Sequence, residues 1–183
     1  MLRHLPNLLS GLRLLAAPFA AWLILSQHDT AALAVFAAAG TSDALDGFIA
    51  RHWGFTSRFG ARLDPAADKL LMLLCFAALY GVAAAPLWLV VLVIGRDLAI
   101  AAGWLFARAI ALPLSLEPLR IGKLTTAVQI GYIGAMLVLL AFDLEWPRGI
   151  MVAAYATGLV TLLSAIAYAH LLLRGLLAGS RTA

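Results

Sequence analysis

Six long apolar segments limit what this chain can fold into more than any other feature of its sequence. Short polar or Gly/Pro-containing connections separate them, and they cover about Pro6–Ser26, Thr30–Ala50, Leu63–Tyr80, Pro86–Ala107, Lys123–Phe142 and Gly149–Arg174. A membrane-spanning helix needs about 20 predominantly apolar residues. The segments are too long and continuous for barrel strands, and an open sheet would leave edge amides and carbonyls unsatisfied in lipid. The sequence therefore predicts an all-α membrane protein with six transmembrane helices in one bundle.

The composition supports this prediction, because 64% of the 183 residues are hydrophobic and only 12% are charged. A soluble domain is about half apolar and about a quarter charged. Six spans leave little chain for a separate soluble module, so we expect a single domain over residues 1–183.

Lys and Arg are distributed unequally between the connections, which indicates the orientation of the helices. The connections "QHDT" and "YGVAAAP" carry neither residue, and the third connection on that side carries only Arg148. The opposite side collects Arg3, Arg51, Arg58, Arg62, Arg108, Arg120, Lys123, Arg174 and Arg181. Both termini are therefore predicted to be cytoplasmic. Orientation and contact with anionic membrane lipids explain the net charge of +4, and we expect no nucleic-acid partner.

The first segment has some features of a signal peptide. Arg13 interrupts its apolar centre, however, and the apolar stretch continues to Leu25, which favours a retained helix. No Ser/Arg-rich transit extension precedes it, so we expect an integral protein of the bacterial cytoplasmic (inner) membrane.

Four aspartates gather in "SDALDGFIARHWGFTSRFGARLDPAADK", where the second predicted helix ends and the third begins. Asp43 and Asp46 are three residues apart and Asp64 and Asp68 are four apart, so each pair shares one helix face. A short connection makes the two helices antiparallel neighbours, and the carboxylates can converge at the cytoplasmic surface. Buried carboxylates need a positive partner, and oxygen-only ligation suits Mg²⁺, Mn²⁺ or Ca²⁺. Two such ions can clamp the charged oxygens of a displacement at phosphorus.

Two other interpretations of the aspartates compete with a metal site. The first is a solvated helix end that pairs with arginines, but ionisable residues in membrane segments are generally functional. The second is a proton or ion pathway, which predicts further carboxylates deeper along other helices, and the predicted outer half of the bundle is almost free of charge.

The spacing of this window reads D-x2-D-G-x2-A-R-x8-G-x3-D-x3-D. It resembles the signature of the CDP-alcohol phosphatidyltransferases at every fixed position, and the layout of six helices resembles that family too. The resemblance implies that a phosphatidyl group passes from a CDP-linked lipid, usually CDP-diacylglycerol, to an alcohol at the cytoplasmic face, with release of CMP.

The same resemblance implies roles for single residues. Metal ligands for two divalent cations, Mg²⁺ or Mn²⁺, would be Asp43, Asp46, Asp64 and Asp68. Asp68 would also be the catalytic general base on the acceptor hydroxyl. The CDP moiety would lie against Asp43, Gly47, Ala50, Arg51 and Gly60. Homodimers are usual in the family, which implies a homodimer here.

The acceptor is predicted from residues outside the aspartate window. The stretches "LPNLLSGLRLLAAPFAAWLI", "VIGRDLAIAAGWLFA" and "IGKLTTAVQI" look most like the cardiolipin synthase branch, whose acceptor is phosphatidylglycerol. The alternative is the phosphatidylglycerophosphate synthase branch, which uses glycerol 3-phosphate and often carries an A-R-E tract followed by a second Arg. Here the tract is Gly95-Arg96-Asp97 and the later position is Trp104, which suits a lipid acceptor better.

A phosphate-bearing acceptor needs cations, and Arg96, Arg120 and Lys123 are the candidates on the fourth and fifth predicted helices. Positive-inside anchoring explains Arg120 equally well. Asn7 and Arg13 resemble a polar pair on the first helix of the family, without an assigned role. An alternative from another functional class is a small membrane ion carrier or a metal-binding structural subunit.

Overall fold

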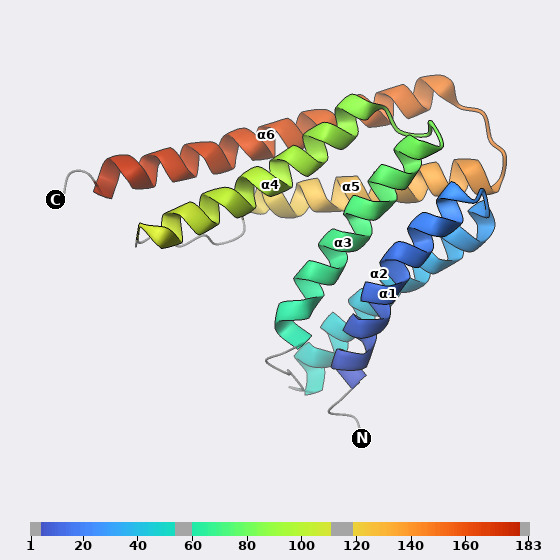
Figure 1. The fold of residues 1–183 in the computed structure, drawn as a ribbon, viewed down its shortest axis with the longest axis horizontal. Coiled ribbons are helices and arrows are strands. Elements are labelled where there is room, and N and C mark those ends of the chain that lie inside the picture. Colours follow the sequence, from blue (N-terminus) through green and yellow to red (C-terminus); the bar gives the residue numbers. More distant parts are fainter. Residues whose placement is uncertain (1–4, 54–59, 111–118, 180–183) are drawn as a thin grey trace. The chain divides into compact units, whose positions relative to one another are not determined.

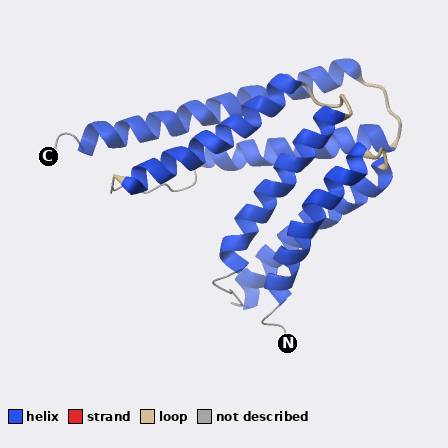
Figure 2. Cartoon of the chain, in the orientation of Figure 1, coloured by secondary structure: helices blue, strands red, loops and turns tan. Residues whose placement is uncertain are grey.

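The computed structural model of the chain describes residues 5–53, 60–110 and 119–179, with side chains for residues 11–42, 67–110 and 119–177. Within these residues it contains six helices and no strand (Figures 1 and 2). The helices are α1 (Leu5–Leu25), α2 (Asp29–Trp53), α3 (Gly60–Gly81), α4 (Leu87–Ala109), α5 (Arg120–Ala141) and α6 (Pro147–Gly179). Each overlaps one predicted segment, and α6 continues beyond the predicted end at Arg174. The all-α prediction is confirmed for this part of the chain.

Three of the described helices are long and apolar enough to cross a membrane: Leu87–Ala109, Arg120–Ala141 and residues Pro147–Leu177 of α6. In α1 the described apolar stretch is shorter and covers Gly11–Leu25. Helices of this length and hydropathy are typical of an integral membrane protein. A crossing by all six helices stays a prediction.

Three short connections end their helices with the same backbone motif. After α1, the amide of Gln27 donates to Ile24 and the amide of His28 donates to Leu23, at N···O distances of 3.0 and 2.9 Å. The same pair of bonds follows α3 and α5. In each case the second residue after the helix has a positive φ, 58° at Gln27, 58° at Ala83 and 51° at Asp143. This motif satisfies the last helix carbonyls and reverses the chain within a few residues.

The chain divides into two compact units. The first unit comprises Met1–Ala85 and Ile133–Trp146, and the second comprises Pro86–Tyr132 and Pro147–Ala183. In the first unit, α1 packs against both α2 and α3. Buried small residues line this packing, among them Ala17 and Ala20 of α1, Ala32 and Ala39 of α2, and Ala67, Cys75 and Ala78 of α3. Small side chains let membrane helices approach closely, which brings the beginning of α3 to α1.

In the second unit, α4 packs against α6. The buried face of α6 is small and polar, with Ala154, Thr157, Thr161 and Ser164 each at most 2% exposed. Large apolar side chains lie on its exposed face, including Leu159, Leu162, Leu163 and Ile166. Gly158 faces the indole of Trp88 so closely that an added Cβ would lie 2.6 Å from a ring carbon. Small and polar residues inside with apolar residues outside are typical of helices packed in lipid.

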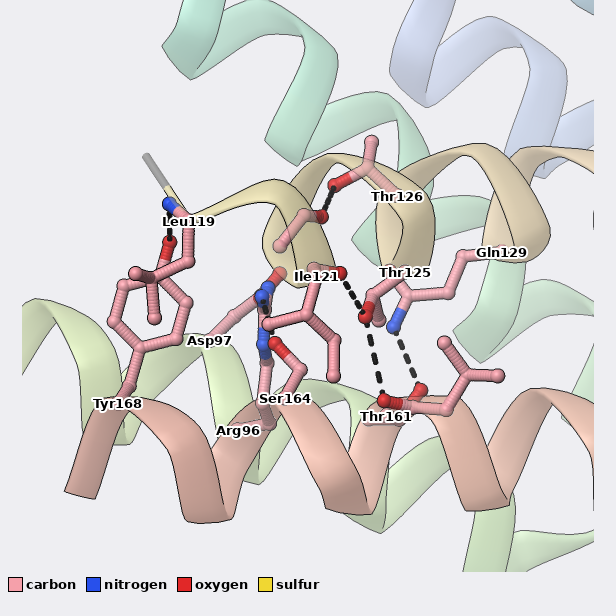
Figure 3. A network of polar contacts seen from close by, with 12 residues as sticks. Arg96, Asp97, Leu119, Ile121, Thr125, Thr126, Gln129, Thr161, Ser164 and Tyr168 are labelled. Carbon is pink, nitrogen blue, oxygen red and sulfur yellow. Dashed lines mark hydrogen bonds and ion pairs between the residues drawn. The ribbon is translucent and has the colours of Figure 1, made fainter. Parts of the chain in front are cut away.

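Hydrogen bonds join α5 to α6 along this polar face (Figure 3). Gln129 Nε2 donates to Thr161 Oγ1 at 3.1 Å, and Thr125 Oγ1 lies 3.3 Å from the carbonyl of Val160. Gln129, Thr125 and Thr161 are all 0% exposed. These bonds fix the rotation of one helix against the other, because a turned helix would leave buried donors unsatisfied.

Thr161→Val is therefore expected to destabilise the protein by about 1 kcal/mol, because it removes the acceptor of the buried Gln129 amide. A second change, Gln129→Leu, is expected to restore part of the loss by removing the orphaned donor as well. Unfolding of the purified protein in mixed detergent measures both. Thr126→Val is the matched control, because the Thr126 hydroxyl donates to the Gly122 carbonyl of its own helix, at 3.2 Å. Equal losses for Thr161→Val and Thr126→Val would contradict the role of the interhelical bond.

Candidate functional site

The aspartate pairs lie on two helices of the first unit. Asp43 and Asp46 belong to the last part of α2, and Asp64 and Asp68 belong to the first part of α3. Their spacings of three and four residues therefore fall on helical backbone, as predicted, and each pair shares a helix face. The side chains of Asp43, Asp46 and Asp64 lie outside the described residues, so the convergence of the four carboxylates stays a prediction.

The residues predicted to contact CDP occupy the same two helix ends. Gly47, Ala50 and Arg51 lie in the last two turns of α2, and Gly60 begins α3. Their side-chain surroundings lie outside the described residues.

Asp68 is the one aspartate of the window whose side chain the structure describes, and it pairs with Arg13 of α1. Arg13 Nη1 donates to Asp68 Oδ1 at 2.9 Å. The Arg13 side chain is 2% exposed, whereas that of Asp68 is 41% exposed. The arginine is thus buried between α1 and α3, and the carboxylate that it holds still reaches the surface of the unit. A charge-assisted bond of this kind restricts the directions that the carboxylate can take.

The sequence singled out Arg13 without assigning it a partner. Its position inside an apolar helix was a usable signal, because a buried guanidinium needs an opposite charge nearby. The candidates were several aspartates, and only the packing of α1 on α3 shows that Asp68 is a partner.

The donor chemistry of this window fits a hard divalent cation, because all four predicted ligands are carboxylates. Within the described side chains, no group of three or more His, Cys, Asp or Glu residues could hold a metal ion. Three of the four predicted ligands lie outside those side chains, so this observation does not bear on the predicted pair of ions.

The candidate cations for the acceptor all lie in the second unit. Arg96 of α4 is buried, and its guanidinium makes two hydrogen bonds (Figure 3): Nη1 to Asp97 Oδ1 at 2.6 Å and Nη2 to Ser164 Oγ at 2.7 Å. The guanidinium carbon also lies 5.6 Å from the centre of the Tyr168 ring, which is within the range of a cation–π contact. Arg120 and Lys123 lie in the first turn of α5 and are both exposed.

Arg96 makes its polar contacts with side chains of the protein, whereas Arg120 and Lys123 present their charges at the surface. Ser164 and Tyr168 were absent from the sequence interpretation, because a serine and a tyrosine in an apolar helix give no signal until packing shows what they face.

Comparison with known proteins gives the relatives of the chain. The family model described as CDP-alcohol phosphatidyltransferase matches residues 3–169 and so spans both units. A cardiolipin synthase (CMP-forming) of Rattus norvegicus is 35% identical over 182 residues, which cover 91% of this chain and 60% of that protein. The cardiolipin synthase (CMP-forming) of Streptomyces coelicolor is 42% identical over 99 residues, or 51% of this chain and 46% of that protein. A probable phosphatidylglycerophosphate synthase of Mycobacterium tuberculosis is 32% identical over 178 residues, or 93% of this chain and 82% of that protein.

Proposed function

The chain belongs to the CDP-alcohol phosphatidyltransferase family, and from this membership we propose that it transfers a phosphatidyl group from CDP-diacylglycerol to an alcohol with release of CMP. The observation that carries the proposal is the unbroken run of eight spaced positions from Asp43 to Asp68, within a family match over residues 3–169. The chain spans about 60% of the length of the rat cardiolipin synthase that it matches.

The proposed reaction is a displacement at the phosphorus nearer the diacylglycerol. The acceptor oxygen forms a bond to that phosphorus, the bond to the CMP oxygen breaks, and the hydroxyl proton passes to the carboxylate of Asp68. Asp68 suits this role because its side chain is 41% exposed and held from the protein side by Arg13. Asp43, Asp46, Asp64 and Asp68 would hold two divalent cations, Mg²⁺ or Mn²⁺. When bound, these ions neutralise the pyrophosphate of the donor.

The CDP moiety of the donor is proposed to lie along the end of α2 and the beginning of α3. Gly47 and Gly60 would let the nucleotide approach the helix backbone, with Ala50 as the small neighbour one turn on. Arg51 would supply a positive charge to the donor phosphates.

For the acceptor we propose phosphatidylglycerol, which makes the product cardiolipin. Cardiolipin synthases among the relatives support this choice. Trp104 supports it as well, because its side chain is 44% exposed on α4 and offers apolar surface to a lipid. The alternative acceptor is glycerol 3-phosphate, and the similarity of the chain to the probable phosphatidylglycerophosphate synthase of M. tuberculosis supports it. Both acceptors carry a phosphate, which Arg120 and Lys123 can contact directly because both are exposed.

An acceptor screen with the purified protein tests this function. CDP-diacylglycerol and Mn²⁺ are supplied with phosphatidylglycerol, glycerol 3-phosphate, inositol phosphate or serine in turn, and CMP release is measured. We expect CMP with phosphatidylglycerol. CMP release with glycerol 3-phosphate alone would show that glycerol 3-phosphate, and not phosphatidylglycerol, is the acceptor. If no acceptor gives CMP release, the enzyme function is wrong and the ion-carrier or metal-binding alternative is favoured.

The proposed setting is a bundle in which all six helices cross the bacterial cytoplasmic membrane, with both termini and the aspartates at the cytoplasmic face. The unequal distribution of Lys and Arg supports this orientation. Single cysteines at Gln27 and Ala83, in the Cys75→Ser background, should react with a membrane-impermeant maleimide from outside the cell. Labelling from the cytoplasmic side alone would show that the topology is the reverse of the proposed one.

A homodimer is proposed from the family, and native mass spectrometry in detergent measures the oligomeric state.

Arg13→Met is expected to lower kcat by roughly 10–100-fold, the usual effect of losing a group that orients a catalytic side chain. The guanidinium would no longer hold Asp68 Oδ1, while the methionine keeps much of the apolar length in the helix. Arg13→Lys is expected to retain part of the rate, because it keeps the charge without the planar fork. CMP release at saturating substrates measures the effect. Arg108→Met is the control, because Arg108 is exposed on α4 and its guanidinium stacks on Trp104. Equal rates for Arg13→Met and Arg108→Met would contradict the role of Arg13.

A further inference from the structure

A cluster of contacts in the second unit joins α4, the beginning of α5 and α6 around the Arg96 guanidinium. Asp97 on the same helix binds Nη1, and Ser164 of α6 binds Nη2, which is buried. Tyr168 lies one turn beyond Ser164 on α6 and presents its ring to the guanidinium at 5.6 Å. Two groups of α6 thus hold one side chain of α4, and a planar guanidinium held at two nitrogens has little rotational freedom.

The hydroxyl of Tyr168 extends this cluster to α5 (Figure 3). It accepts a hydrogen bond from the backbone amide of Leu119 at 3.3 Å, directly before α5 begins at Arg120. The carbonyl of Leu119 in turn accepts the amides of Gly122 and Lys123 at 2.9 and 3.3 Å. Tyr168 therefore fixes the residue from which the first turn of α5 is built.

Gly122 shows how closely that turn lies against the cluster. A Cβ at this position would be 2.7 Å from the Tyr168 hydroxyl oxygen, 3.3 Å from its ring and 3.5 Å from Arg96 Nη2. The first distance is shorter than any normal contact of a Cβ, so a side chain here would push Tyr168 and α5 apart. Gly122 is buried, whereas its neighbours Arg120 and Lys123 are exposed.

We propose that Tyr168 is a positioning residue for the acceptor. Together with Arg96 it fixes the first turn of α5, and this sets the direction in which Arg120 and Lys123 present their charges to an acceptor phosphate. The inference rests on the proposed function, since it assigns these two exposed cations to the phosphate of phosphatidylglycerol or glycerol 3-phosphate. It gives Arg96 an indirect role, because its guanidinium is held by side chains of the protein.

Three variants test the proposal in the CMP-release assay, with KM measured separately for acceptor and for CDP-diacylglycerol. Gly122→Ala is expected to raise the acceptor KM by about tenfold, which is within the range of coupling between residues in contact, and to change the donor KM by less than about twofold. Tyr168→Phe removes the hydroxyl and keeps the ring over Arg96, so it should raise the acceptor KM less. The double variant combines Gly122→Ala with Tyr168→Phe, so the hydroxyl oxygen that would lie 2.7 Å from the new Cβ is absent. Its acceptor KM is therefore expected to be lower than that of Gly122→Ala alone.

Gly131→Ala is the matched control on the same helix, because nothing lies within 4 Å of a Cβ there. Tyr155→Phe is the matched control on α6, because its side chain is 60% exposed. Both should leave the acceptor KM unchanged.

The outcomes separate this inference from the function on which it rests. If the wild-type protein releases no CMP with any acceptor, the proposed function is wrong and the inference fails with it. If the wild-type protein is active but Gly122→Ala matches Gly131→Ala in acceptor KM, the positioning role alone is wrong. Equal increases in donor and acceptor KM would also overturn it, since they indicate a general structural loss. If the Gly122→Ala protein does not accumulate in the cell, the acceptor KM of Tyr168→Phe is compared with that of Tyr155→Phe. We expect the acceptor KM to rise in Tyr168→Phe alone.

Discussion

Asp68→Asn is expected to lower CMP release by about 10²–10⁴-fold while CDP-diacylglycerol still binds, because the amide cannot take the proton of the acceptor hydroxyl. The substitution leaves the shape of the side chain nearly unchanged. Its oxygen can still accept the hydrogen bond that Arg13 Nη1 now donates to Asp68 Oδ1 at 2.9 Å. The contact between α1 and α3 should therefore persist, and the loss should fall on kcat. Single-turnover CMP release, together with donor binding by thermal shift, measures both parts.

Asp143→Asn is the control for this experiment. Asp143 is exposed in the connection after α5, and its φ of 51° is one that asparagine adopts readily. Its rate should equal that of the wild-type protein. Unimpaired turnover in Asp68→Asn would remove Asp68 from the role of base, whatever the donor binding shows.

Asp43→Asn is expected to shift the Mn²⁺ dependence of CMP release to higher concentration by at least about 10–100-fold, the range that loss of an outer-shell partner already costs. An amide is a neutral and weaker donor to a hard cation than a carboxylate. Binding of the donor should weaken in parallel, because the pyrophosphate needs that charge neutralised. Titration of the rate with Mn²⁺, and of donor binding at each Mn²⁺ concentration, measures the two effects together.

Asp29→Asn is the matched control, because Asp29 lies in the first turn of the same helix, at the opposite end from Asp43. Asp29→Asn should lower the free energy of unfolding by only about 0.3–1 kcal/mol, which is the contribution of an acidic side chain at a helix N-terminus. It should leave the Mn²⁺ dependence of CMP release unchanged. An unchanged Mn²⁺ titration in Asp43→Asn would show that Asp43 is not a metal ligand.

Helix positions could be predicted from the sequence because a lipid environment demands about 20 apolar residues in an unbroken run. Where the residues at a helix end are themselves helix-compatible, the pattern does not say where the helix stops. For that reason the sixth segment was predicted to end at Arg174, whereas α6 runs to Gly179. The ends after α1, α3 and α5 were harder to predict, because Gln27, Ala83 and Asp143 adopt the positive φ that usually belongs to glycine.

The family was also readable from the sequence, since the resemblance depends on residue types at fixed spacings between Asp43 and Asp68. The match over residues 3–169 confirms the family. The roles of the single aspartates stay predictions, which the two substitutions above test.

What the sequence by itself determined was the local arrangement: six apolar segments that form helices, two aspartate pairs on helix faces, and an unequal distribution of Lys and Arg between the connections. These follow from short-range periodicity, which depends only on near neighbours in the chain. Tertiary structure alone decided the pairing of Arg13 with Asp68, 55 residues apart, and of Arg96 with Ser164, 68 residues apart. The reason is physical: a buried guanidinium needs an acceptor, but which of several acceptors it meets depends on how closely two helices pack. In this chain small residues such as Ala17 and Ala20 of α1 and Gly158 of α6 set that approach.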